Sequence, residues 1–395
     1  MKTELVTLSR KELKRAIVIE KALEGQMSNT ECASFLGLSV RQVIRLKKVC
    51  RHDGSDGLAH GNRGRKPRHA LSQEIKDQVL ALYGSKYDGS NCCHFTELLK
   101  EHEGMELSVS SVRRILREGA PQQKPVHRRP RAHRPRERKA QAGMMWQIDA
   151  TPYPWLEEHI PPFALHAAID DATGIVTGAV FRGHECMEGY FAVMKQGILN
   201  FGLPLSLYSD KHTIFRSPNE KLTVEQELMG EEKPLSQFGM AMKELNIEHI
   251  KANSPQAKGR VERLWLTLQD RLAIELRLSG VTTMEDANKV LSELLKKHNR
   301  RFAVKPEITE PAYLKPERDL NLDHVFAIRE YRRISSGNTI SFKGEIYTPK
   351  RREECLFETK SIVEVRKSMS GEIFIWHNGK AVMLKKVTKS QKLVA

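Results

Sequence analysis

Three carboxylates stand where short apolar segments end or where a helix is expected to begin. Asp149 lies in "MWQIDATPY", Asp210 closes "LSLYSD", and Glu262 lies in "NSPQAKGRVERLW". A buried carboxylate is costly unless a cation compensates its charge, and neither aspartate has a Lys or Arg in its own apolar segment. Three such groups in one pocket would form an all-oxygen ligand set suited to two Mg²⁺ or Mn²⁺ ions and to phosphodiester chemistry.

Glu262 has a second interpretation, because a lone Glu beside Arg is usually a solvated ion pair. Helical spacing favours the first interpretation, since it predicts an apolar stripe and a separate polar face on the helix that carries Glu262. The stripe is Val261, Trp265, Leu268 and Leu272, and the polar face is Lys258, Glu262 and Gln269. Glu262 is therefore expected to point towards a sheet edge.

The elements that position these acids form an α/β layer structure over residues 144–305. Strands are expected around Asp149, in "FALHAAIDDATGIVTGAVFRG" on both sides of a turn, before Asp210, and in "IEHIKA". Helices are expected at Met187–Phe201, in "LSQFGMAMKELN", from the segment of Glu262 onwards, and at Glu285–Arg301. The order β-β-β-α-β-α-β-α predicts a mixed sheet with helices on its faces and acids at strand ends.

A different pattern follows the core. Residues 306–325 form a proline-broken connector, and alternating apolar and polar residues dominate residues 326–390. Short strands at even spacing, separated by Gly344, Pro349, Gly371 and Gly379, are typical of a small β-barrel.

Residues 1–60 carry the pattern of a helix-turn-helix. A helix is expected over residues 10–24, and Ser28 with Glu31 and Ser39 with Gln42 form two capping-box patterns that begin two further short helices. The last helix carries side chains that can reach phosphates and base edges, namely Arg41, Gln42, Arg45, Lys47 and Lys48. The alternative is an ordinary helical bundle with a basic surface.

Two basic linkers flank a second, looser helix-turn-helix pattern at residues 71–120. Residues 61–70 contain Gly-Arg-Lys-Pro, which suits either a minor-groove arm or a plain tether, and residues 121–143 form a Pro/Arg-rich run. The candidate DNA contacts are Arg63, Arg65 and Lys66 in the first linker, Arg113, Arg114 and Arg117 in the second domain, and Arg128, Arg129 and Arg131 in the second linker.

The net charge of +16 is concentrated at one end of the chain. Residues 1–139 hold 29 Lys and Arg against 16 Asp and Glu. Such a local excess of positive charge indicates a polyanionic partner, most often nucleic acid. A membrane surface is disfavoured because no long apolar run or lipidation motif is present.

Cysteine usage and the N-terminus favour a cytoplasmic protein. The six cysteines are scattered without a CxxC pair, which disfavours disulfides and a structural zinc, although Cys92, Cys93, His94 and His102 could in principle offer ligands. No apolar segment of a secretory signal follows Lys2.

The motifs "WQIDAT", "DDATG", "LYSD" and "NSPQAKGRVERLW" together resemble the catalytic core of DDE transposases and retroviral-type integrases, which have a ribonuclease-H-like fold. The overall layout is similar to an insertion-sequence transposase of the ISNCY kind. The resemblance implies that Asp149, Asp210 and Glu262 are the catalytic and metal-binding triad. It also implies that Lys258, supported by Arg260 or Arg263, holds DNA phosphates.

The resemblance further implies double-stranded DNA as substrate. A protein of this family binds terminal inverted repeats, hydrolyses the 3′-end phosphodiester, and uses the freed hydroxyl to attack target DNA. Because two ends must be held together, we expect at least a dimer on DNA, associated with the bacterial nucleoid. No Walker-type glycine loop is present, and transesterification requires no nucleotide cofactor.

One departure concerns spacing. Between Asp210 and Glu262 lie 51 residues, which is more than in a common version of this motif. Glu244 or Glu248 fits that version better by count alone. Context favours Glu262, because neither alternative follows the Ser-Pro-Gln…Gly loop and because "RSPNEKLTVEQELMGEEKP" is a natural insertion.

For several other residues, a structural role is favoured over a functional one. Asp170 and Asp171 are expected in a turn, His166 as a satisfied strand histidine, and Trp146 and Trp155 in the core. His212 is a candidate to support Asp210. Two further functions compete with transposition: a DNA-binding regulator with an inactive core, and a ribonuclease-H-type nuclease.

Overall fold

The computed structural model describes residues 9–59, 70–119, 136–156, 160–217, 234–252, 259–350 and 357–387. The chain forms two compact units, Met1–Asp77 and Gln78–Ala395, and each is described by itself. None of the helices in the described ranges is long and apolar enough to cross a lipid bilayer.

The first unit is helical. It contains α1 (Arg10–Leu23), α2 (Asn29–Leu36), α3 (Val40–Asp53) and the short 3₁₀ helix η1 (Gly54–Leu58). Both predicted capping boxes are confirmed, at Ser28 with Glu31 and at Ser39 with Gln42. Gly37 ends α2 with a φ of 65°, a left-handed conformation that glycine adopts without steric cost.

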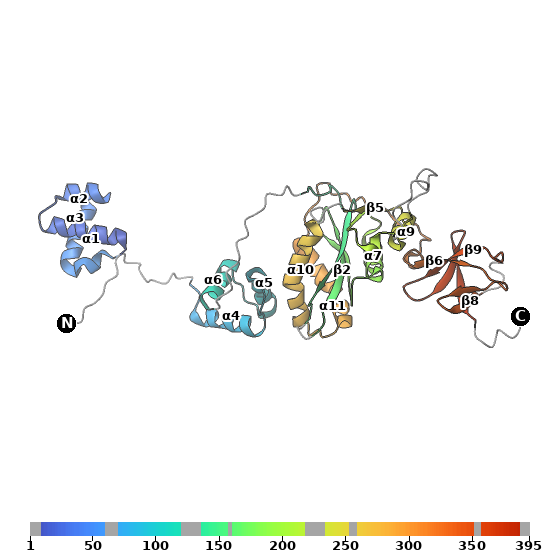
Figure 1. The fold of residues 1–395 in the computed structure, drawn as a ribbon. Helices are drawn as coiled ribbons and strands as arrows, with labels where there is room; N and C mark the ends of the chain where they lie inside the picture. The colour runs from blue at the N-terminus through green and yellow to red at the C-terminus, as the bar shows by residue number, and fades with distance from the viewer. Residues whose placement is uncertain are drawn as a thin grey trace. The chain divides into compact units, whose positions relative to one another are not determined.

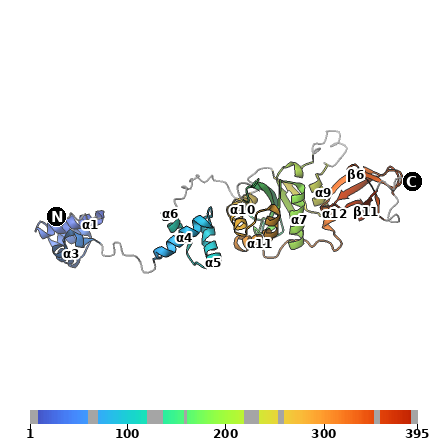
Figure 2. The same cartoon turned by 90° about the horizontal axis from the view of Figure 1, so that it is seen from below.

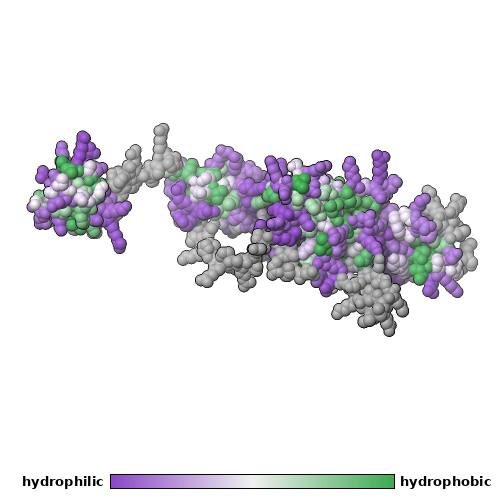
Figure 3. Space-filling view, turned by 90° about the horizontal axis from the view of Figure 1, so that it is seen from above, coloured by the Kyte–Doolittle hydropathy of each residue, from purple (hydrophilic) through white to green (hydrophobic). Residues whose placement is uncertain are grey.

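A small apolar core joins these helices. Ile19 of α1, Cys32 of α2 and Val43 of α3 are fully buried, and Leu58 of η1 closes the cluster. On the face that Figure 3 shows, hydrophilic and apolar residues of this unit are interspersed. Leu13, Ile17 and Phe35 are exposed. The sequence patterns therefore located these helices correctly, and their role in DNA binding stays a prediction.

Three helices begin the second unit, although α4 (Gln73–Ser85) starts before its boundary. The other two are α5 (Cys92–Glu103) and α6 (Val109–Gly119). Phe95 and Leu99 of α5 and Ile115 of α6 are buried. Ion pairs attach α5 to the helices of the core, with Arg271 Nη1 2.7 Å from Glu97 Oε2.

A five-stranded mixed sheet forms the centre of the second unit. Its strands are β1 (Trp146–Tyr153), β2 (Phe163–Asp170), β3 (Val176–Arg182), β4 (Ser206–Ser209) and β5 (Glu248–Lys251). Their order is β3-β2-β1-β4-β5. The first three strands pair antiparallel, whereas β1 with β4 and β4 with β5 pair parallel. The predicted mixed α/β core is confirmed.

Helices cover both faces of this sheet (Figure 1 and Figure 2). On one side, α7 (Met187–Phe201) and α9 (Gln237–Glu244) pack with Trp146 and Ile148 of β1. On the other side, α10 (Gly259–Leu278) and α11 (Met284–Phe302) pack with Leu165 and Ala167 of β2. The 3₁₀ helix η2 (Thr213–Phe215) follows β4. Trp146 and Trp155 are fully buried, as predicted.

Strands dominate the C-terminal part. After the short helix α12 (Leu322–Val325) come β6 (Ile328–Arg333), β7 (Ile340–Phe342), β8 (Glu345–Pro349), β9 (Ile362–Lys367), β10 (Ile373–His377) and β11 (Lys380–Lys386). They form one antiparallel sheet in the order β6-β9-β10-β11-β8-β7, with its own apolar cluster. The strands were predicted, and closure into a barrel stays a prediction.

Candidate active site

Asp149 in β1 and Asp210, the residue after β4, occupy matching positions relative to the pairing of these two parallel strands. The pairing of β1 with β4 ends at Gln147 and Tyr208. Asp149 lies two residues beyond Gln147, and Asp210 lies two residues beyond Tyr208. Because parallel neighbours advance together along a sheet, both carboxylates stand at the carboxyl-terminal edge of this strand pair.

Each aspartate is held by a specific hydrogen bond. The indole N–H of Trp265 on α10 donates to Asp149 Oδ2 at 3.0 Å. The backbone N–H of His212 donates to Asp210 Oδ1 at 2.9 Å. Both carboxylates are partly buried, so these bonds orient groups that still face solvent on one side.

The hydroxyl of Tyr190 is bonded to Glu185 and is influenced by the charges of Asp149 and Asp210. Burial raises its pKa far above the usual range, and the charges of Glu185, Asp149 and Asp210 raise the pKa further. Tyr190 donates a hydrogen bond to Glu185 Oε1 at 2.5 Å. Glu185 Oε1 is also 3.8 Å from His212 Nδ1, so His212 connects Glu185 to the Asp210 loop.

Glu185 is a further candidate for the site, and no sequence pattern indicated it. It lies in "GHECMEGYF", two residues before α7 begins. An acid in that place is ordinary near the N-terminus of a helix, where it interacts favourably with the helix dipole. Only the packing of Tyr190 against the sheet reveals that Glu185 is near Asp210.

Glu262 lies in the first turn of α10 and is exposed. Residues 253–258, which contain Lys258, are outside the described ranges. Three contacts hold α10 along β1: Val261 N to Gln147 Oε1 at 3.3 Å, Trp265 Nε1 to Asp149 Oδ2 at 3.0 Å, and Gln269 Nε2 to Thr151 Oγ1 at 3.3 Å. These contacts recur at every fourth residue of α10 and every second residue of β1. They fix the position of the α10 backbone beside Glu262 relative to β1.

The two alternative acids lie elsewhere. Glu244, at the end of α9, forms ion pairs with Arg329 and Arg366 of the C-terminal sheet, the second at 3.0 Å. Glu248 is exposed and pairs with Ser206 at the start of β4. Asp210 follows the opposite end of β4, about 13 Å away at the usual rise per strand residue.

The described residues contain no group of three or more Asp, Glu, His or Cys side chains that could hold a metal ion. Asp149, Asp210 and Glu262 are all described, so the structure does not bring these three acids together as such a group. The donor types are all carboxylate oxygens, which suit a hard divalent cation better than zinc.

The expected turn role of Asp170 is observed. The expectation of a satisfied His166 holds only in part, because its buried Nδ1 has no hydrogen-bond partner among the described residues. Asp170 is fully buried and accepts hydrogen bonds from Thr173 N at 2.8 Å and Gly143 N at 2.7 Å, so it stabilises the turn after β2. His166 Nε2 accepts from Cys186 N at 3.0 Å, and burial lowers the pKa of His166 to about 4.

The candidate DNA contacts differ in how freely they reach solvent. Arg41, Arg45 and Lys48 of α3 are exposed, as are Arg113, Arg114, Arg117 and Arg263. By contrast, Lys47 donates to Ala22 O at 2.9 Å, and Gln42 completes a capping box. Arg260 is mostly covered and lies 3.6 Å from Asp171. Arg63, Arg65, Lys66, Arg128, Arg129, Arg131 and Lys258 lie outside the described residues.

The sequence matches two transposases over most of its length. It is 33% identical to the transposase for insertion sequence IS1202 of Streptococcus pneumoniae, covering 92% of this chain and 84% of that protein. It is 34% identical to "Putative transposase y4bF" of Sinorhizobium fredii, covering 86% of this chain and 73% of that protein. No family model matches the chain.

Similar solved structures include viral integrases. A chain of the simian T-cell lymphotropic virus intasome, in complex with PP2A regulatory subunit B56 gamma, matches 78% of this chain and 99% of its own, with TM-score 0.32 and 18% identity. The HTLV-2 integrase catalytic core domain, in complex with magnesium, matches 39% of this chain and 85% of its own, with TM-score 0.28 and 21% identity.

Proposed function

Because the chain belongs to the insertion-sequence transposases, we propose that it binds the terminal inverted repeats of its element and joins them to target DNA. The reaction is Mg²⁺-dependent cleavage at the 3′ ends followed by strand transfer, carried out by a ribonuclease-H-like core. In this proposal the enzyme is a DDE polynucleotidyl transferase.

The observation that carries the proposal is the placement of Asp149 and Asp210. Asp149 within β1 and Asp210 just after β4 both follow the last β1–β4 pair by two residues, in the same direction along these parallel strands. Two carboxylates at such an edge provide oxygen ligands and repel each other unless a cation lies between them.

Glu262 is proposed as the third acid. Its backbone neighbour Val261 bonds to Gln147 on the same strand as Asp149, at 3.3 Å. Glu244 is engaged with two arginines, and Glu248 is at the other end of its strand pair from Asp210. These contacts favour Glu262 over both alternatives, in agreement with its loop context.

Asp149, Asp210 and Glu262 would hold two Mg²⁺ or Mn²⁺ ions. Such ions activate the attacking water or 3′-hydroxyl and stabilise the leaving oxygen when bound. Trp265 orients the Asp149 carboxylate, and the His212 amide orients that of Asp210. Fixed carboxylates reduce the reorganisation needed to bind the DNA strand in a reactive position.

DNA binding is proposed for the helical elements and the basic segments. The exposed arginines of α3 and α6 offer side chains for phosphates and base edges, and the charge of residues 1–139 strengthens attachment to DNA. Cutting and joining two ends together requires at least two copies of the chain on DNA. Light scattering of the protein–DNA complex tests this, and a single copy holding both ends would contradict it.

The decisive experiment incubates the purified protein with labelled element ends, target DNA and Mn²⁺. Joined products indicate a transposase, cleavage without joining indicates a nuclease, and binding without either indicates a regulator. The Glu262→Gln variant is expected to lose joining by more than a hundred-fold while still binding the ends. Glu244→Gln is the matched control, and it should retain joining per folded molecule.

Equal loss of joining in both variants, with unchanged stability, would reject Glu262 as the specific third acid. Loss in Glu244→Gln alone would assign the role to Glu244.

A further inference from the structure

The carboxylate of Asp171 joins three separate segments of the second unit. It is fully buried, directly after β2. Its Oδ1 accepts a hydrogen bond from Gln147 Nε2 at 2.9 Å and one from Arg136, and its Oδ2 accepts from Lys139 N at 2.8 Å. Arg260 Nε on α10 lies 3.6 Å from Oδ1. None of these contacts belongs to the turn in which Asp171 was expected.

The Gln147 side chain forms hydrogen bonds with both Asp171 and the first turn of α10. Its side chain is fully buried, and its Oε1 accepts a hydrogen bond from Val261 N at 3.3 Å. The first N–H groups of a helix have no partner within the helix, so Gln147 supplies the cap that the chain before α10 would otherwise have to provide. An ionised carboxylate accepts only, so Asp171 engages the NH₂ of Gln147 and leaves its oxygen facing the helix.

This arrangement links the two elements that carry the proposed acids. Gln147 precedes Asp149 by two residues on β1, and Val261 directly precedes Glu262 on α10. A rotation of the Gln147 amide would present NH₂ to the N–H of Val261 and break the cap. The Asp171 carboxylate therefore determines the orientation of the Gln147 amide, and through it the position of the first turn of α10 relative to β1.

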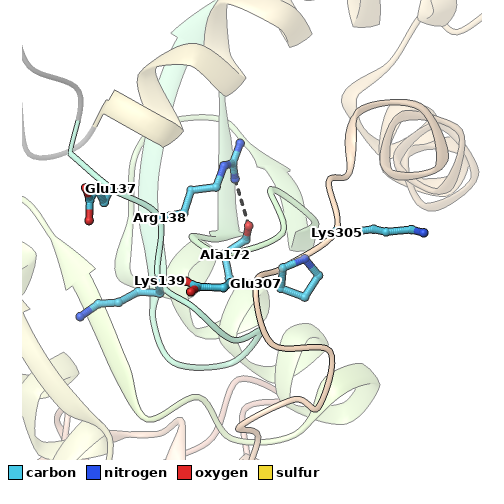
Figure 4. A pocket seen from close by; sticks show the side chains of 7 residues that line it. Glu137, Arg138, Lys139, Ala172, Lys305 and Glu307 are labelled. Atoms are coloured by element: carbon cyan, nitrogen blue, oxygen red, sulfur yellow. Dashed lines mark hydrogen bonds between the residues drawn. The ribbon is translucent and has the colours of Figure 1, made fainter.

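The end of the basic linker is attached to the same carboxylate. Besides the bonds from Arg136 and Lys139, Arg138 Nη1 donates to Asp171 O at 3.1 Å. It also donates to Ala172 O at 3.2 Å, the bond drawn in Figure 4. Arg260 Nη2 donates to Arg136 O at 3.0 Å. Burial lowers the pKa of Arg260, and the neighbouring Arg138 lowers it further.

We propose that Asp171 is a positioning residue for the reaction: it orients Gln147, which caps α10 and thereby sets Glu262 relative to Asp149. This inference rests on the proposed role of Glu262 as a metal ligand. The described end of the linker before the core, at Arg136 and Lys139, therefore contacts the same Asp171 carboxylate that orients Gln147.

Asp170 provides a matched comparison. It is adjacent in sequence, equally buried, and also accepts several hydrogen bonds. Its partners are Gly143, Thr173 and the Tyr313 hydroxyl, and none of them is on α10. Loss of Asp170 should therefore reduce stability without moving the first turn of α10.

The test uses the full chain and measures Mn²⁺ binding by calorimetry, counting only the binding that Glu262→Gln removes. Asp171→Asn is expected to weaken this binding by about ten-fold, the lower end of the range for residues that support metal ligands. It should also slow joining of labelled ends by 10- to 100-fold, the scale of loss expected from a small misplacement of a reacting group. Asp170→Asn should leave Mn²⁺ affinity per folded molecule within two-fold of the parent protein.

Two further variants keep the test decisive if Asp171→Asn folds poorly. Gln147→Met leaves Asp171 and the linker in place but removes the cap, and it should weaken Mn²⁺ binding to the same extent. Combining Asp171→Asn with Gln147→Glu reverses the donor and acceptor, keeps one negative charge, and should restore part of the affinity. A purely structural role in the turn would not respond to this exchange.

Unchanged Mn²⁺ affinity in both Asp171→Asn and Gln147→Met would overturn the inference, as would equal losses in the Asp170 and Asp171 variants. If Glu262→Gln itself removes no Mn²⁺ binding from the parent protein, the proposed function of Glu262 fails instead. The two failures are therefore distinguishable.

Discussion

The hydrogen bond between Trp265 and Asp149 offers a sharp test of how the site is built. Replacing Trp265 by Phe keeps an aromatic ring in the apolar cluster but removes the N–H that donates to Asp149 Oδ2 at 3.0 Å. A hydrogen bond to a charged group contributes about 1.5–3 kcal/mol. Because Asp149 is only partly buried, we expect the lower part of that range.

Trp155 supplies a matched control within the same cluster. It is fully buried, and its Nε1 has no hydrogen-bond partner among the residues that the structure describes. Trp155→Phe therefore loses comparable packing, on the order of 1–2 kcal/mol, without losing a bond to a carboxylate. The difference between the two variants isolates the contribution of the Trp265 N–H, about 1.5–2 kcal/mol.

Urea unfolding of the full chain, followed by circular dichroism, measures this difference as a shift in midpoint at constant slope. Joining of labelled ends, normalised to folded protein, should fall in Trp265→Phe and stay near the parent value in Trp155→Phe. Equal destabilisation by the two substitutions, or a larger effect at Trp155, would refute the assignment of the indole N–H as a support for Asp149.

Two further predictions concern packing and pH. Gly197→Ala on α7 should destabilise the protein by about 1–3 kcal/mol in thermal unfolding, because its new Cβ would lie 2.6 Å from the Trp146 ring. Gly84→Ala, where no atom lies within 4 Å, should be neutral or stabilising instead. The pKa of His166 is about 4 in the folded protein, below its ordinary value, so the unfolded chain binds more protons. Above about pH 6.5, His166 is neutral in both the folded and the unfolded chain and does not change the free energy of unfolding. As the pH drops from about 6.5 towards 4, the unfolded chain takes up a proton that the folded protein does not, so the free energy of unfolding should fall. The variant His166→Gln should flatten that part of the stability profile, and an unchanged profile would contradict the role of His166.

Local patterns in the sequence determined a large part of this protein. Ser28 with Glu31 and Ser39 with Gln42 interact across three residues, so the helix starts that they make depend on little beyond their own segment. The bounds of α7 at Met187 and Phe201 followed in the same way from periodicity and from the glycine after it. The family also follows from sequence, because identity extends over most of the chain.

Tertiary structure alone decided how the acids around the site differ. Asp170 and Asp171 are neighbours in one turn-like sequence, yet the first stabilises the turn and the second reaches Gln147 and the linker. Glu185 was indistinguishable from any acid before a helix until Tyr190 packed beside it. Such roles depend on strand register and on contacts between residues far apart in the chain. No local pattern encodes them, because each partner is specified by how the sheet and its helices pack.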